Sequence, residues 1–97
     1  MRRIRFDLRA RAEYRQVVEF YKGEGVLIAR EFAAETRAAL DLIAELPHGS
    51  SADQDGIRKK TLRKFPYTIV YTLTDDLIEV IAFAHERRKP GYWRTRL

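Results

Sequence analysis

The pattern of apolar and polar residues changes period near the start of the chain. Over residues 2–8 apolar side chains alternate with charged ones, which is typical of a half-buried strand. Beyond Asp7 apolar residues recur at the three-to-four spacing of one helix face; they are Tyr14, Val17, Val18 and Tyr21. We expect Asp7 to cap this helix. Gly23 and Gly25 should end it, because glycine tolerates the backbone conformations of a tight turn.

A second apolar stripe follows and predicts a longer helix over residues 26–46, which Pro47 ends. The connection between the two helices is so short that they must be antiparallel neighbours, with a shared apolar face that covers a sheet. The large aromatic residues of these helices are therefore expected in the core; they are Tyr14, Tyr21 and Phe32.

The second half of the chain predicts three strands after a loop at residues 47–56. The strand at 57–65 is basic on both sides, as expected at a sheet edge. The strand at 67–74 alternates, and the strand at 77–85 is apolar on both sides except for Glu79, as expected inside a sheet. The sequence therefore predicts a single α+β domain over residues 1–97: an N-terminal strand, an antiparallel helical hairpin, and a three-stranded antiparallel meander that forms a small sheet.

Composition narrows the functional classes. The chain has 97 residues, 19 Lys and Arg against 14 Asp and Glu, and a net charge of +5, which favours an acidic protein, a phosphate backbone or an acidic membrane as partner. The absence of cysteine excludes disulfides and thiolate metal sites. No apolar run has the length of a signal peptide or a membrane span, so we expect a cytoplasmic protein that does not act at a membrane.

Three short segments, in this order, carry a resemblance to a known family. They are Arg-Lys-Phe-Pro-Tyr at 63–67, the strand ending Ala84-His85 with Arg87-Arg88 after it, and Tyr92-Trp93-Arg94. Together with the element order they resemble the RelE/ParE superfamily of bacterial toxin–antitoxin modules, over essentially the whole chain. The ParE branch, often labelled plasmid-stabilisation proteins, is the more similar.

The resemblance implies a toxin that needs no cofactor and is neutralised by a cognate, ParD-like antitoxin. It also implies that the toxin forms a homodimer or, together with the antitoxin, a heterotetramer. ParE-like members inhibit DNA gyrase. RelE-like members instead cleave messenger RNA on the ribosome, without metal.

The residues that RelE-like cleavage uses are only partly present. Lys59 matches the first of two second-strand lysines, but Thr61 stands in place of the second, and Thr68 in place of an arginine on the third strand. Only Arg87 and Tyr92 match beyond that, so much of the cationic cradle for a phosphorane would be missing.

The two histidines differ in what they could do, and His85 has two interpretations. His85 could act as a general base in an RNase, or it could hydrogen-bond the backbone at the sheet margin. His48 lies far from it in a loop, so the two make no zinc site. The RNase alternative would use the set Lys59, His85, Arg87 and Tyr92.

The helix carboxylates are expected to be solvated charges without paired-carboxylate chemistry; they are Glu13, Glu19, Glu31 and Glu35.

The C-terminal tail is the predicted target-binding surface, because arginine and aromatic residues anchor protein interfaces and stack on bases. Its residues are Arg87, Arg88, Tyr92, Trp93 and Arg94. Trp93 has a second interpretation, in which the ring folds back over the sheet or the hairpin. The hairpin groove and the basic edge strand, with Arg58, Lys60 and Arg63, are predicted to dock an acidic antitoxin.

We therefore expect a ParE-like toxin that blocks DNA gyrase by protein contact rather than by catalysis. A RelE-like, ribosome-dependent endoribonuclease is the alternative. A basic nucleic-acid-binding module that acts alone is a third class, but the arginines lie on the strands and the tail rather than on a recognition helix.

Overall fold

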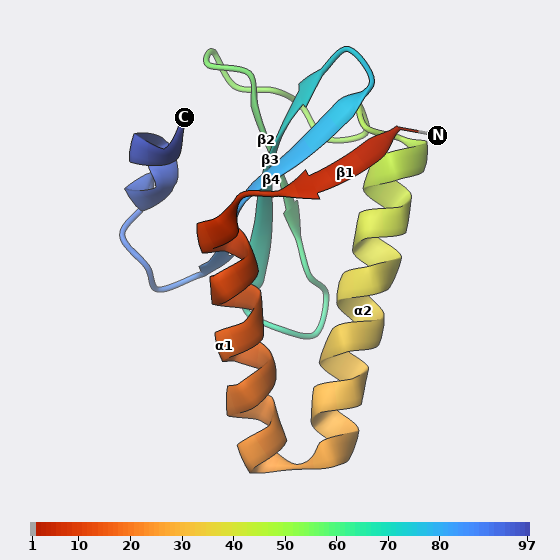
Figure 1. Cartoon of the computed structure of the whole chain (residues 1–97), viewed down its shortest axis with the longest axis vertical. Coiled ribbons are helices and arrows are strands. Elements are labelled where there is room, and N and C mark those ends of the chain that lie inside the picture. The colour runs from red at the N-terminus through yellow and green to blue at the C-terminus, as the bar shows by residue number, and fades with distance from the viewer. Residues whose placement is uncertain (1) are drawn as a thin grey trace.

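The computed structural model describes residues 2–97, and its elements follow the predicted order (Figure 1). They are β1 (Arg3–Phe6), α1 (Leu8–Glu24), α2 (Val26–Glu45), β2 (Ile57–Thr61), β3 (Tyr67–Thr74), β4 (Leu77–His85) and the 3₁₀-helix η1 (Tyr92–Arg96). The prediction of an α+β fold with an N-terminal strand, a helical hairpin and three further strands is confirmed.

The four strands form one mixed sheet in the order β1-β4-β3-β2. The pairs β2–β3 and β3–β4 are antiparallel, and β1 lies parallel to β4. The basic strand β2 therefore lies at one edge and the apolar strand β4 lies inside, as their residue patterns predicted. A bulge between Val70 and Tyr71 shifts the register of β3 against β4.

The ends of α1 and the start of α2 have local causes. Asp7 accepts a hydrogen bond from the backbone N–H of Arg9 at 2.8 Å, so the predicted N-cap is confirmed, and the first strand ends at Phe6 rather than at Leu8. Gly25 has φ of 154° and joins the two helices directly. Its missing Cβ permits a conformation that other residues avoid.

The predicted strand at 57–65 was too long, because β2 ends at Thr61. Beyond it the chain turns toward the helices and buries Leu62 and Phe65. The Glu35 carboxylate on α2 accepts hydrogen bonds from the backbone N–H groups of Arg63 and Lys64. This carboxylate takes the place of a strand partner for these two backbone donors where the chain leaves the sheet.

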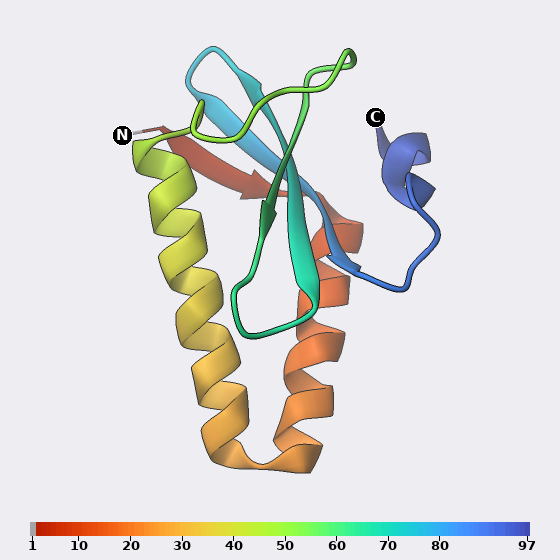
Figure 2. The ribbon, with the colours of Figure 1, turned by 180° about the vertical axis from the view of Figure 1, so that it is seen from behind.

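The sheet carries a hydrophobic cluster on each face. The larger one lies under the hairpin and centres on Phe32, which is fully buried, with five aromatic rings at centroid distances of 5.2–6.1 Å: Tyr14, Tyr21, Phe65, Tyr67 and Phe83. The smaller cluster contains Ile57, Val70, Ile81, Ala82 and Trp93, so the C-terminal tail covers the other face. In both ribbon views η1 lies beside the N-terminal end of α1 and away from α2 (Figure 2).

Candidate functional site

Trp93 fastens the C-terminal tail to the sheet. Its side chain is 3% exposed and packs with Ile57 and Val70. The Lys59 ammonium lies 5.6 Å and the Arg94 guanidinium 4.8 Å from the ring centroid. Of the two interpretations from the sequence, the structure shows the ring folded back over the sheet. Trp93 is therefore an anchor here, and it does not add to the exposed face of the tail.

Glu13 on α1 receives four hydrogen bonds from distant parts of the chain. The backbone N–H of Phe83 donates to Oε1 at 3.0 Å, and the Tyr92 hydroxyl donates to Oε2 at 2.7 Å. The Arg96 guanidinium donates to both oxygens at 2.9 Å. The Glu13 side chain is 13% exposed and that of Arg96 is 11% exposed. The expectation that Glu13 is a solvated helix charge was therefore wrong.

This group, which we name the Glu13 clasp (Glu13, Tyr92 and Arg96), completes the edge of β4. Strand β1 pairs with β4 only as far as Val80. Beyond that point Phe83 N–H donates to Glu13, and the Ile81 carbonyl accepts from Arg96 at 3.0 Å. Because buried backbone groups must find partners, these side chains take the place that a longer β1 would fill.

The clasp also fixes the protonation of its members. Burial raises the pKa of the Glu13 carboxyl, but hydrogen bonds from Arg96, Tyr92 and Phe83 N–H lower it more, so the pKa is below its ordinary value. Burial, and next the hydrogen bond to Glu13, raise the pKa of Tyr92. Tyr92 is thus a hydrogen-bond donor at neutral pH and is poorly suited to general acid–base work.

The exposed part of the tail is a basic loop, residues 86–91, held at both ends. At its start Glu86 N–H donates to the Pro66 carbonyl at 2.9 Å, and Arg87 N–H donates to His85 Nδ1 at 3.0 Å. At its end the Arg88 guanidinium lies 3.8 Å from the centroid of the Tyr92 ring. Arg87 and Arg88 are both exposed. The loop therefore presents two guanidinium groups between two ends that are fastened to the rest of the fold.

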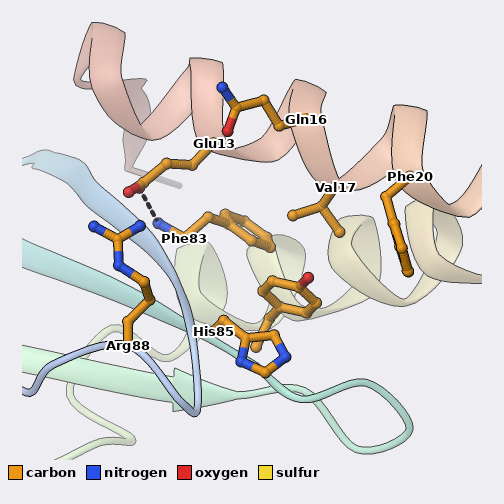
Figure 3. Close-up of a pocket in the computed structure, with 8 residues that line it drawn as sticks. Glu13, Gln16, Val17, Phe20, Phe83, His85 and Arg88 are labelled. Atoms are coloured by element: carbon orange, nitrogen blue, oxygen red, sulfur yellow. Dashed lines mark hydrogen bonds between the residues drawn. The ribbon is translucent and has the colours of Figure 1, made fainter.

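A groove of about 270 Å³ separates this loop from α1 (Figure 3). Its floor is apolar and aromatic, and its rim carries charged and polar groups; the lining residues are Glu13, Gln16, Val17, Phe20, Tyr67, Phe83, His85 and Arg88. In Figure 3 the Arg88 and His85 side chains lie on the sheet side, opposite Gln16 and Phe20 of α1. Phe20 is 59% exposed, so the groove offers an apolar contact next to the cationic loop.

The residues of the RNase alternative do not converge. Lys59 pairs in register with Val70 and contacts Trp93, so it lies on the tail face of the sheet. His85 pairs with Tyr67, and their rings meet edge to face at 5.0 Å on the hairpin face. His85 Nδ1 accepts a backbone N–H, which is the structural interpretation considered for it. The sheet thus separates the lysine from the histidine.

The remaining predicted site residues are engaged in different ways. Arg94 pairs with Asp55 at 3.0 Å and with Asp53 at 3.5 Å, which ties the tail to the loop before β2. Arg58 donates to the Ser50 carbonyl. Lys60 lines a second groove of about 120 Å³, together with the exposed apolar residues Leu42 and Leu46, and Arg63 is exposed.

Within residues 2–97 no three His, Cys, Asp or Glu side chains are placed to hold a metal ion. The same residues include no helix with the length and apolarity needed to cross a bilayer.

Comparisons with known proteins agree with the fold. A sequence profile of the family described as "ParE toxin of type II toxin-antitoxin system, parDE" matches residues 4–90. A chain from the chromosomal ParDE TA system of P. aeruginosa has a similar structure, with a TM-score of 0.72 and 16% sequence identity over 88% of this chain and 96% of that chain. No curated protein sequence matches significantly. Because the family profile spans nearly all of the folded elements, the chain belongs to the ParE toxin family of type II toxin–antitoxin systems.

Proposed function

We propose that this toxin inhibits DNA gyrase by protein contact, without catalysing a reaction. The observation that carries the proposal is the basic loop, in which Arg87 and Arg88 are exposed on a backbone held by β4 at one end and by the Glu13 clasp at the other. Arginine is enriched among the residues that dominate binding energy at protein interfaces. A loop ordered before binding loses less entropy when it meets its target.

The chemistry of the site favours contact over RNA cleavage. Cleavage without metal needs a base, an acid and a cationic cradle around one phosphate. Here Lys59 and His85 lie on opposite faces of the sheet, and Tyr92 has a raised pKa and donates to Glu13. The basic loop needs no such convergence to block another protein.

We also propose that an acidic, ParD-like antitoxin neutralises the toxin. The structurally similar chain comes from a ParDE TA system, and this chain has a net charge of +5. The groove at Lys60 is the proposed docking place, since the exposed Leu42 and Leu46 lie beside a cation. Arg58 and Arg63 extend the positive charge along the same edge of the sheet.

Gyrase supercoiling with the purified toxin tests the proposal. Relaxed plasmid should stay relaxed when the toxin is present, and supercoiling should return when the antitoxin is added. Unchanged supercoiling at saturating toxin would exclude gyrase as the target.

Primer extension on translated messages tests the alternative with the same protein. New ends inside codons would identify an RNase and contradict the contact mechanism.

Arg63→Gln is a suitable control variant in the supercoiling assay, because it lies outside the basic loop and should leave inhibition intact while it weakens relief by the antitoxin.

A further inference from the structure

We infer that Glu13 is a positioning residue for target contact: its carboxylate on α1 holds the basic loop in the orientation that the target recognises. This inference rests on the proposed function, since it concerns how the loop is presented to a protein target. Glu13 itself lies on the rim of the groove, with its oxygens occupied by the tail and by β4.

The orientation passes from Glu13 to the loop through Tyr92. The Tyr92 hydroxyl donates to Glu13 at 2.7 Å, which holds the end of the ring beside α1. The Arg88 guanidinium stacks over that ring at 3.8 Å, and the Arg96 guanidinium lies 5.2 Å from the same centroid. A short charge-assisted hydrogen bond is strong and directional, and a guanidinium over an aromatic face is held by the ring's quadrupole. The Glu13 carboxylate therefore sets where Arg88 points.

Removing the carboxylate would leave several donors without an acceptor at once. Arg96 is largely buried, and its guanidinium would lose both carboxylate oxygens and keep only the Ile81 carbonyl as an acceptor. Tyr92 and the backbone of Phe83 would compete for what remains. A buried charge without its partner is strongly unfavourable, so Tyr92 and Arg96 should move away from α1 and return their polar groups to water, which opens the site around the neighbouring Trp93. The aromatic cluster under the hairpin should persist, because its side chains pack on the other face of the sheet from Trp93.

Glu13→Gln is the sharpest variant, because it keeps the size of the side chain and removes its charge. The amide can accept through one atom only, and its NH₂ group would face the donors of Tyr92 or Arg96. The matched control is Glu19→Gln on the same helix. Glu19 is 72% exposed and pairs only weakly with Lys22, at 3.6 Å.

The chain has a single tryptophan, so its emission reports on the tail directly. Trp93 is buried in the wild-type protein. In Glu13→Gln the emission should shift to the red and become accessible to acrylamide, while the far-UV circular dichroism of the hairpin stays unchanged. The toxin concentration for half-maximal inhibition of supercoiling should rise by about tenfold or more, because a loop that Glu13 no longer orients must be ordered when it binds. Glu19→Gln should match the wild type in both measurements.

Two results would overturn the inference: wild-type emission in Glu13→Gln, or a red shift without loss of potency. If Glu13→Gln does not fold, Arg96→Gln removes the same ion pair from the tail side and must show the same red shift and loss of potency.

Growth inhibition in cells, measured in parallel, separates this inference from the proposed target. If the wild type arrests growth without affecting gyrase, the proposed target is wrong, and loss of growth arrest in the folded Glu13→Gln variant still decides the role of Glu13.

Discussion

Replacing Trp93 with phenylalanine tests whether this ring is an anchor or a contact. The side chain is 3% exposed against the sheet. A buried aromatic side chain removes roughly 150–250 Å² from water, worth about 4–6 kcal/mol at ~25 cal/mol per Å². Phenylalanine retains most of that area and fits the same apolar site, so the expected loss is about 1–2 kcal/mol. A domain of this size is stable by about 5–15 kcal/mol, so the variant should remain folded.

Urea denaturation followed by far-UV circular dichroism measures that loss, and growth inhibition measures function. We expect Trp93→Phe to retain toxicity, because a smaller ring still anchors the tail. Trp93→Ala should abolish it, because the substitution removes about 3–5 kcal/mol of the packing that anchors the tail to the sheet. A Trp93→Phe variant that unfolds cooperatively and yet has lost toxicity would show that the indole itself meets the target, and the anchor argument would then be wrong.

Three further predictions concern stability and pH. Phe32→Ala should lower the free energy of unfolding by about 3–5 kcal/mol in urea titrations, because the ring is fully buried at the centre of the aromatic cluster. A loss below about 1 kcal/mol, which is what a surface substitution costs, would contradict the packing. Glu35→Gln should cost about 1–2 kcal/mol in the same titrations, because the backbone N–H groups of Arg63 and Lys64 lose a charged acceptor; an unchanged midpoint would argue against this contact. Because the pKa of Glu13 is lowered in the folded state, the stability that its carboxylate contributes is complete above the pKa of the unfolded state and is lost as pH falls through the folded-state value. Wild-type Trp93 emission should therefore shift to the red as the solution is acidified from about pH 5. An equal shift in Glu13→Gln on acidification would show that another group causes it.

Local patterns were sufficient for most of the fold. The strands Tyr67–Thr74 and Leu77–His85 have the predicted bounds, because consecutive residues of a strand point to opposite faces of the sheet and so show whether one face or both are buried. The turn at Gly25 and the Asp7 cap are equally local. The parallel pairing of β1 with β4 could not be predicted in this way, since it joins residues more than 70 positions apart.

The site was less predictable, for the same reason. Glu13 resembles the other helix glutamates in sequence, and nothing near it signals the donors on Phe83, Tyr92 and Arg96. Trp93 had two interpretations because an aromatic residue in a basic tail suits either an anchor or a contact. Once the strand order is known, β1 is seen to be too short to pair with the whole of β4. A carboxylate on the neighbouring part of α1 could then have been predicted to accept hydrogen bonds from the unpaired end of β4.

The most direct test of the account neutralises the basic loop and leaves its fastening intact. In the double variant Arg87→Gln and Arg88→Gln, the Glu13 clasp and the buried Trp93 should be preserved, so tryptophan emission should match the wild type. Inhibition of gyrase supercoiling should then fall by about tenfold or more, as for the loss of central interface arginines. Full inhibition by a folded double variant with wild-type emission would contradict the claim that these two guanidinium groups contact the target.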